Sequence, residues 1–155
     1  MGKRMFWRIL TSGMLAVVLV LQVACSDADR KAELESITVY KSPTCGCCTK
    51  WVSHLQANGF EVETIDLQDM SAVKAEAGIS RQLSSCHTAK TGGYVIEGHV
   101  PADDIKRLLK ERPDVTGLTV PGMPMGSPGM EGYRKDNYDV LTFTRTGETA
   151  VFSRH

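Results

Sequence analysis

Three of the chain's five cysteines lie within four residues, in the stretch Ser42-Pro43-Thr44-Cys45-Gly46-Cys47-Cys48-Thr49-Lys50-Trp51. The residues just before it, Ile37-Thr38-Val39-Tyr40, are β-branched or aromatic, which favours a strand. From Lys50 to Gly59 apolar residues recur at helical spacing. The cysteines are therefore predicted to lie on a strand-to-helix turn, where unpaired N–H groups and the positive end of the helix dipole stabilise a thiolate.

The composition is that of one ordinary globular domain. The 155 residues are 42% hydrophobic and 23% charged, which is enough to form a single core. The 18 basic and 18 acidic residues balance, so there is no basic surface that would indicate a nucleic-acid partner.

Residues 1–24 have the layout of a secretory signal peptide. Lys3, Arg4 and Arg8 precede an apolar run over residues 14–21, and small residues follow it. The run is short for a membrane-spanning helix, although a retained anchor is the alternative. Removal of residues 1–24 takes away three basic residues and no acidic one, which leaves 15 against 18 and a net charge of −3. We expect a polar tether over residues 25–36 and an exported domain over residues 37–155.

Cys25 ends the stretch Leu21-Gln22-Val23-Ala24-Cys25, which resembles a bacterial lipoprotein cleavage box. In that interpretation Cys25 carries lipid as the first residue of the mature protein. Gln22 departs from the aliphatic residue usual at its position, and cleavage after Ser26 or Ala28 also leaves small residues in the right places. Lipid anchoring through Cys25 and ordinary cleavage are both open, and both lead to export.

Beyond the cysteine turn, the patterns predict alternating strands and helices. They give a strand over 37–41, a helix over 46–58, a strand over 60–66, a helix over 70–77, a hairpin of 86–89 with 94–97, a helix opened by Pro101, a loop rich in Gly, Pro and Met over 118–130, and a C-terminal hairpin of 138–144 with 149–152. The order β-α-β-α-β-β-α predicts an α/β, thioredoxin-like single domain.

The four cysteines of the exported domain are expected to be paired or to hold a metal, because bare thiols oxidise outside the cytoplasm. Purely structural disulfides fit poorly, since a bond between neighbours such as Cys47 and Cys48 closes almost no loop. Cys45 and Cys48 have the Cys-x-x-Cys spacing of thiol-disulfide oxidoreductases, in which one thiol attacks and the other resolves. Cys47 complicates that chemistry because it offers a competing resolving thiol.

For metals the extra thiol is useful. The side chains at 47 and 48 diverge by about 100° around a helix, so they bridge neighbouring ions better than they chelate one. A site with several thiolates favours Cu(I), zinc or an iron–sulfur cluster. Zinc comes second to copper, because structural zinc sites usually pair two Cys-x-x-Cys knuckles and this chain has one.

Further donors are candidates as additional metal ligands. His87 adjoins Cys86 and is either a nitrogen ligand or a hydrogen-bonded strand histidine. The thioethers of Met123, Met125 and Met130 suit Cu(I), with packing on the core as the alternative.

The other histidines are predicted to have no part in the site. His54 lies two helical turns beyond Cys47, about 10 Å away, and is interpreted as structural. His99 and His155 have no soft partner nearby in the sequence and are expected at solvent-exposed or loop positions.

Four segments resemble the CopG family of bacterial periplasmic copper-resistance proteins, long described as a domain of unknown function. They are Tyr40-Lys41-Ser42-Pro43-Thr44-Cys45-Gly46-Cys47-Cys48, Ser85-Cys86-His87-Thr88-Ala89, Gly93-Tyr94-Val95-Ile96-Glu97-Gly98-His99-Val100-Pro101 and Pro121-Gly122-Met123-Pro124-Met125-Gly126-Ser127-Pro128-Gly129-Met130-Glu131. The resemblance implies a thioredoxin-like fold, a periplasmic location and a multi-copper cluster held by Cys45, Cys47, Cys48 and Cys86, with a role in copper redox interconversion. Thioredoxins proper carry a cis-proline where this chain has Ser85, which argues against disulfide exchange on protein substrates.

These observations predict a periplasmic protein that holds Cu(I) in a cysteine thiolate cluster and contributes to copper homeostasis and resistance. An oxidoreductase that interconverts Cu(I) and Cu(II) for an efflux pump or an oxidase is one form of this function. The alternatives are a thiol-disulfide oxidoreductase that uses Cys45 and Cys48, and a passive copper chaperone or buffer. The copper hypothesis requires that three sulfur atoms from the turn and one from Cys86 converge.

Overall fold

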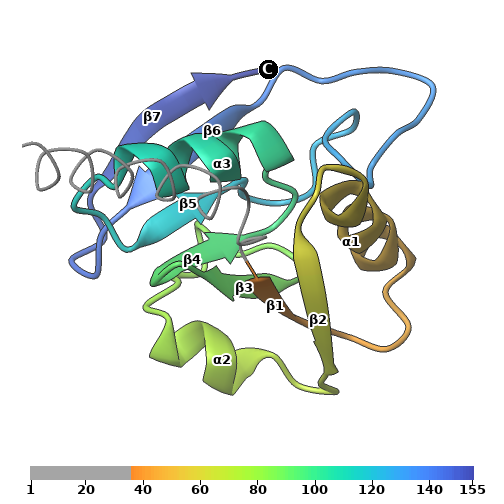
Figure 1. Ribbon diagram of the computed structural model, residues 1–155, viewed down its shortest axis with the longest axis horizontal. Helices are drawn as coiled ribbons and strands as arrows, with labels where there is room; N and C mark the ends of the chain where they lie inside the picture. The colour runs from red at the N-terminus through yellow and green to blue at the C-terminus, as the bar shows by residue number, and fades with distance from the viewer. Residues whose placement is uncertain (1–35) are drawn as a thin grey trace, which may run out of the picture. The chain divides into compact units, whose positions relative to one another are not determined.

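The computed structural model describes residues 36–155, which contain three helices and seven strands (Figure 1). In chain order they are β1 (Ser36–Lys41), α1 (Gly46–Ala57), β2 (Glu61–Asp66), α2 (Ser71–Glu76), β3 (Thr88–Thr91), β4 (Tyr94–Glu97), α3 (Ala102–Glu111), β5 (Gly117–Thr119), β6 (Asp139–Phe143) and β7 (Thr149–Arg154). The predicted signal peptide, Cys25 and all but the last residue of the predicted tether lie outside the described residues. Among the helices that are described, none combines the length and apolar character needed to span a membrane.

All seven strands belong to one sheet in the order β2-β1-β3-β4-β5-β6-β7. β1 runs parallel to β2, with α1 as the connection between them, and antiparallel to β3. β3 and β4 form a hairpin, and β4 continues into α3. This succession confirms the predicted β-α-β-α-β-β-α order, and the fold is an α/β, thioredoxin-like one. β5, β6 and β7 extend the sheet beyond β4.

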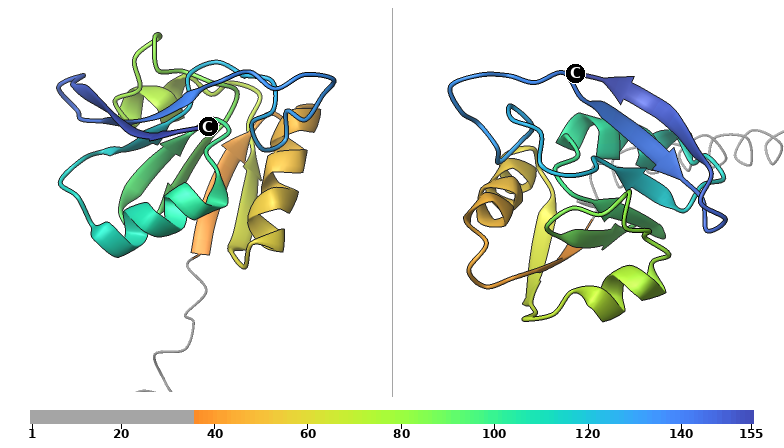
Figure 2. Two further views of the ribbon diagram at one scale, coloured as in Figure 1. Left: turned by 90° about the horizontal axis from the view of Figure 1, so that it is seen from above. Right: turned by 180° about the vertical axis from the view of Figure 1, so that it is seen from behind.

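Helices α1 and α3 lie on one face of the sheet and α2 lies on the other (Figures 1 and 2). The core lies beneath α1 and α3, where Trp51, Leu55, Ile105 and Leu108 are fully buried. Trp51 anchors the cysteine-bearing helix, since its Nε1–H donates to the Val100 carbonyl at 2.9 Å. Loss of a buried tryptophan typically costs about 3–5 kcal/mol, so packing fixes the orientation of α1.

β3 begins at Thr88, so the prediction that this strand starts at Cys86 was wrong. The hairpin ladder ends where Gly98 adopts a φ of 73°, which turns the chain out of the extended conformation. Gly98 N–H still donates to the His87 carbonyl at 3.0 Å. Cys86 therefore lies just before the sheet rather than in it.

β5 was not predicted, because a strand of three residues is too short to show alternation and adjoins the segment rich in Gly and Pro. It pairs parallel to β4 and antiparallel to β6, and so joins the C-terminal hairpin to the sheet. Its first residue has to be glycine, since a Cβ at Gly117 would lie 1.7 Å from the Val95 carbonyl oxygen. The predicted C-terminal hairpin is confirmed as β6 and β7, and residues 120–130 contain no helix, as predicted.

Candidate metal centre

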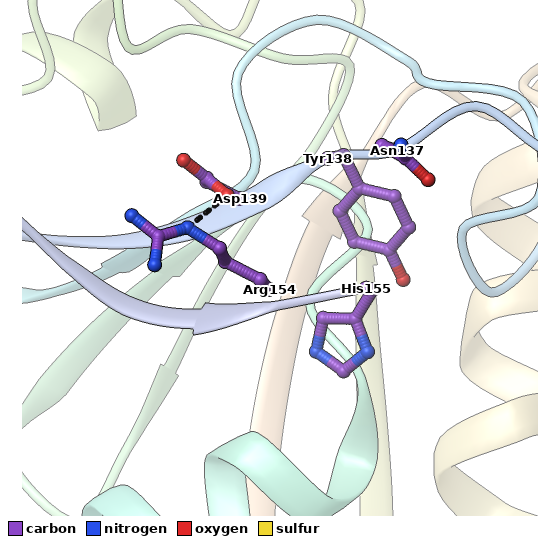
Figure 3. A pocket seen from close by; sticks show the side chains of 5 residues that line it. All are labelled: Asn137, Tyr138, Asp139, Arg154 and His155. Atoms are coloured by element: carbon purple, nitrogen blue, oxygen red, sulfur yellow. Dashed lines mark ion pairs between the residues drawn. The ribbon is translucent and has the colours of Figure 1, made fainter.

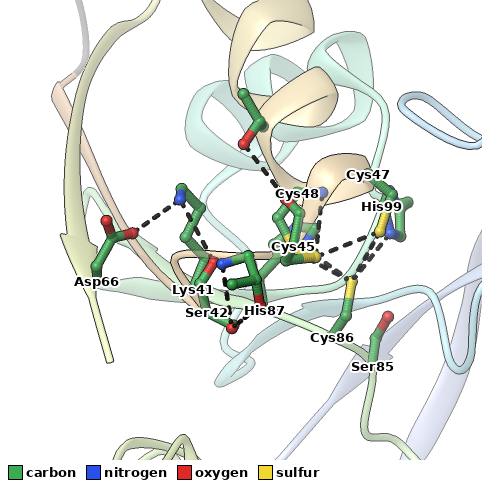
Figure 4. Close-up of a disulfide and its surroundings, with 12 residues drawn as sticks. Lys41, Ser42, Cys45, Cys47, Cys48, Asp66, Ser85, Cys86, His87 and His99 are labelled. Atoms are coloured by element: carbon green, nitrogen blue, oxygen red, sulfur yellow. Dashed lines mark hydrogen bonds and ion pairs between the residues drawn. A yellow bond between two sulfur atoms is a disulfide. The ribbon is translucent and has the colours of Figure 1, made fainter. Parts of the chain in front are cut away.

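The cysteine turn lies at the N-terminus of α1, as the sequence predicts (Figure 4). Cys45 is the N-cap residue, and its Sγ accepts a hydrogen bond from the Cys48 N–H at 3.3 Å. Cys45 and Cys48 form a disulfide, while Cys47 and Cys86 are free thiols. Cys48 is fully buried and the other three cysteines are half-buried. The turn thus places sulfur at the positive end of the helix, where negative charge is stabilised.

The fourth cysteine joins the three of the turn. The four Sγ atoms all lie within 4.8 Å of one another, and they come from two segments 38 residues apart. Cys86 Sγ lies 3.5 Å from Cys48 Sγ and 3.9 Å from Cys47 Sγ, and Cys47 Sγ lies 3.4 Å from Cys45 Sγ. The convergence on which the copper hypothesis depends is therefore present in the fold.

Cys86 is held in position by a buried carboxylate that the sequence analysis did not single out. Glu97 is fully buried at the end of β4, on the face of the sheet that α2 covers, and forms an ion pair with Lys74 of α2. Its carboxylate also accepts from the Ser85 N–H at 2.6 Å and from the Thr88 hydroxyl at 2.7 Å. Because a buried charge is stable only with such partners, Glu97 fixes the chain on both sides of Cys86.

His99 lies in the loop between β4 and α3, as expected, but the prediction that it has no soft partner was wrong. It is fully buried, and its Nε2 lies 3.1 Å from Cys86 Sγ. Its Nδ1 lies 2.8 Å from the Pro128 carbonyl, which only accepts, so Nδ1 carries the proton and Nε2 has the lone pair. Burial lowers the pKa of His99, which favours this neutral imidazole. No signal near His99 in the sequence revealed its partner, because Cys86 is 13 residues away.

His87 is buried between aromatic and imidazole rings. Its ring centroid lies 4.3 Å from that of Trp51 and 4.9 Å from that of His99. Its Nδ1 lies 3.3 Å from Cys86 Sγ, and its Nε2 is the one buried side-chain nitrogen or oxygen in residues 36–155 without a partner. Burial, and then the neighbouring His99, lower the pKa of His87 to about 3, so the ring is neutral at physiological pH. Cys86, His87 and His99 together offer one sulfur and two nitrogens within 4.8 Å.

The thiol of Cys86 is protonated in the metal-free protein. Burial, reinforced by the nearby Cys47, raises the pKa of Cys86 to about 12. A cation bound at the sulfur reverses this preference by replacing the proton. Binding of a soft cation at Cys86 would therefore release a proton.

Comparison with known proteins places these residues in a family. Residues 37–82 match the Glutaredoxin family, and residues 83–130 match a protein family of unknown function, DUF411. Two solved structures of a copper resistance protein, copG Form 1 and copG Form 2, are 48% identical to the chain, each with a TM-score of 0.75. Each alignment covers 79% of this chain, with 98% of the Form 1 chain and 99% of the Form 2 chain. The chain belongs to the CopG family of copper resistance proteins. No curated protein matches it.

Membership of the CopG family gives the protein a copper-related role, and the sulfur-rich centre fits that role. Soft thiolates are preferred ligands of Cu(I), and imidazole suits copper in either oxidation state. The ligand roles of the individual cysteines, of His87 and of the methionines remain predictions.

In this CopG-family chain, the loop rich in Gly, Pro and Met lies over the start of α1. Gly129 approaches so closely that a Cβ there would lie 2.7 Å from the Cys47 carbonyl oxygen and 2.9 Å from the Trp51 nitrogen. Met130 follows directly and is half-buried. Met125 is half-buried beside Gly132, while Met123 is 53% exposed. Met130 is therefore the methionine whose backbone adjoins the closest contact with the helix.

The remaining histidines have other partners. His54 Nε2 accepts from the Ala102 N–H at 3.1 Å and so caps α3, which gives it the structural role that the sequence suggested. His155 Nε2 lies 2.7 Å from an Asp104 carboxylate oxygen, and its ring stacks on Tyr138. Tyr138 and His155 line an open pocket of about 490 Å³ where β6 begins and β7 ends (Figure 3). None of the pocket's lining residues belongs to the group of four cysteines, so the pocket is separate from the candidate metal centre.

Proposed function

We propose that the reduced protein binds several Cu(I) ions in a thiolate cluster made by Cys45, Cys47, Cys48 and Cys86. The observation that carries this proposal is the convergence of four Sγ atoms within 4.8 Å. Thiolate sulfur bridges neighbouring Cu(I) ions readily, and the ions together with the N-terminus of α1 offset the negative charge. Copper is the cargo, and its binding contributes to copper homeostasis and resistance.

His99 and His87 supply nitrogen at the edge of this cluster. The fixed tautomer of His99 leaves the Nε2 lone pair beside Cys86, which is how proteins commonly prepare a histidine ligand. Met130, Met125 and Met123 are further thioether donors in the loop that crosses α1. Zinc is the second choice of metal, because zinc clusters usually use a second cysteine knuckle.

We propose that the domain works in the periplasm, after removal of residues 1–24 and with lipid on Cys25 as one form of anchoring. Export brings the protein to an oxidising compartment in which copper changes between Cu(I) and Cu(II). Its partners would then be periplasmic components of a copper efflux pump or of a copper oxidase. Mass spectrometry of the mature protein distinguishes the two cleavage alternatives.

The experiment is to express the full chain with copper, purify it without oxygen and count the bound metal. We expect more than one copper per chain, and loss of the copper ions together in Cys86→Ser. Ser53→Ala, on the exposed face of α1, is the matched control and is expected to keep its copper. Fewer than one copper per chain in the wild-type protein would contradict the proposal, and preferential retention of zinc from an equimolar mixture would reverse the choice of metal.

One observation favours a second candidate function, a thiol-disulfide oxidoreductase. Cys45 and Cys48 form a disulfide at a helix N-terminus, the place where thioredoxin-like enzymes carry their reactive pair. This function predicts that the metal-free protein reduces insulin and that activity survives Cys47→Ser. A passive chaperone or buffer differs from both in catalysing no electron transfer, which an assay of copper oxidation and reduction by the loaded protein tests.

A further inference from the structure

We propose that the four cysteines divide into two functional pairs, which extends the copper-binding function proposed above and depends on it. Cys45 and Cys48 form the electron-donating pair. Cys47 and Cys86, with His99, hold copper while that pair is oxidised. The dithiol of Cys45 and Cys48 thereby reduces Cu(II) to Cu(I) at the site that retains it.

The disulfide separates the donors into two sets. It occupies the sulfur atoms of Cys45 and Cys48, and a disulfide sulfur carries no negative charge with which to bind a cation. Cys47 and Cys86 keep free thiols with their Sγ atoms 3.9 Å apart. His99 adds its Nε2 lone pair 3.1 Å from Cys86 Sγ. Two sulfurs and one imidazole nitrogen remain available in the oxidised protein.

This remaining set has the chemistry of a site for one copper ion. Thiolates stabilise Cu(I), whereas imidazole accepts both Cu(I) and Cu(II), so the set tolerates a change of oxidation state. In the reduced protein all four sulfurs are available and the capacity for copper is larger. The oxidation state of Cys45 and Cys48 therefore sets how much copper the protein carries.

The two sets are in direct contact. Cys47 Sγ lies 3.4 Å from Cys45 Sγ, and Cys86 Sγ lies 3.5 Å from Cys48 Sγ. Each copper-holding sulfur therefore adjoins one sulfur of the electron-donating pair. An electron passes between them without a large movement of the backbone.

The reaction balances without an additional oxidant. Two Cu(II) ions each accept one electron and become Cu(I), while the thiols of Cys45 and Cys48 lose two electrons and two protons and form one S–S bond. The protons go to solvent, one Cu(I) stays on Cys47, Cys86 and His99, and the other Cu(I) is released. An external dithiol restores the pair by thiol-disulfide exchange and becomes a disulfide itself. Cys45 is half-exposed and Cys48 is fully buried, so the incoming thiolate attacks Cys45.

The first experiment adds excess CuSO₄ without oxygen to the reduced, metal-free full chain. Cu(I) is counted with a chromogenic Cu(I) chelator, and disulfides are mapped by alkylation and mass spectrometry. We expect two Cu(I) per chain in the fast phase, with Cys45 linked to Cys48, and at least a tenfold slower phase in Cys48→Ser. A predominant bond between Cys47 and Cys86, or a Cys48→Ser rate equal to that of the Ser53→Ala control, would overturn the division of roles.

The second experiment measures what the oxidised chain retains. Protein with the Cys45–Cys48 bond intact is titrated with a Cu(I) salt against a competing chelator. We expect one tightly held copper, with at least a tenfold weaker affinity in Cys47→Ser and in His99→Gln, and an unchanged affinity in Ser53→Ala. Equal affinity in all four proteins refutes the proposal. If the reduced chain also fails to bind Cu(I), the copper-binding function itself is wrong, and the two failures are thereby distinguished.

Discussion

The cysteine turn at residues 45–48 and the segment at residues 97–99 contribute to the same centre, but they are encoded in different ways. The turn carries its sulfur donors close together at the start of a helix, and the spacing of its cysteines is enough to predict metal binding or thiol-disulfide exchange. The segment Glu97-Gly98-His99 acquires its role through contacts with residues 12 and 13 positions earlier. The comparison shows that a sequence motif identifies the cysteines of the turn, whereas contacts between segments distant in the sequence position the remaining residues of the centre.

The largest expected effect tests the segment at 97–99. Glu97→Gln removes the buried charge that pairs with the half-buried Lys74 and weakens the support of the Ser85 amide. Breaking a buried pair in this way typically costs about 3–5 kcal/mol of the free energy of unfolding, which denaturant titration measures. Because Glu97 also positions Cys86, Glu97→Gln protein that is folded in the absence of denaturant is expected to lose copper as Cys86→Ser does.

Glu76→Gln is the matched control, because Glu76 also pairs with a lysine, Lys90, but at the surface. We expect little change in stability or in copper content, since exposed pairs contribute little. Equal effects of the two substitutions would mean that the buried position of Glu97 has no special importance.

The second prediction concerns pH and uses the buried His87. In the unfolded chain His87 has its ordinary pKa of 6.5, whereas burial lowers the pKa of the folded His87 to about 3. Between these values the unfolded chain binds a proton that the folded chain excludes, so stability rises with pH by about 1.4 kcal/mol per unit. Burial also lowers the pKa values of His99 and His54, which adds to the slope in the same direction.

Denaturation of the metal-free protein between pH 4 and pH 7.5 measures this slope. His87→Gln is expected to flatten it, whatever its effect on stability at neutral pH. A slope that His87→Gln leaves unchanged would show that the acid sensitivity has another origin.

The third prediction distinguishes His99 from His54, neither of which the sequence analysis assigned to the metal site. His99→Gln removes the nitrogen beside Cys86 and is expected to weaken copper binding by about tenfold, or about 1.4 kcal/mol. His54→Gln removes the cap of α3 instead, and we expect a lower melting temperature with unchanged copper affinity. Competition titrations on both variants measure this difference, and equal affinities would remove His99 from the centre.

The smallest expected effect tests how self-contained the cysteine turn is. Lys41 lies just before it, and its Nζ is 2.7 Å from a carboxylate oxygen of Asp66, which is 52% exposed (Figure 4). Asp66→Asn removes a partly exposed ion pair and is expected to cost less than about 1 kcal/mol, without change in copper content. A loss of copper would show that the turn also depends on a long-range contact.

The sequence predicted those features that arise from neighbouring residues. The strand-to-helix turn, the two hairpins and the three helices follow from alternation, helical spacing and turn residues, and the structure contains them. β5 was missed because it is defined by its two partner strands rather than by its own three residues. The start of β3 was placed two residues too early because the turn at Gly98 ends the ladder from the opposite strand.

In the candidate site, too, some residues could be predicted from the sequence and others could not. Cys86 was recognised as a partner of the turn because cysteine is rare and its chemistry is specific. The partners of His99 were missed, since a histidine in a loop sequence gives no sign that it adjoins Cys86 or that the Pro128 carbonyl fixes its tautomer. Glu97 was overlooked because a glutamate at the end of a strand is ordinary until its burial is known.

Gly129 brings the loop rich in Gly, Pro and Met into direct contact with α1. Position 129 has room only for a hydrogen, so main chain rests directly on main chain above the first turn of α1. Peptide groups therefore cover α1 beside Cys47, and they have no side chain that could move aside. We therefore expect metal ions and reductants to reach the cysteines from the side on which Cys45 is exposed to solvent. A larger residue at position 129 is expected to displace the loop from α1 and to raise the rates of both metal binding and metal release.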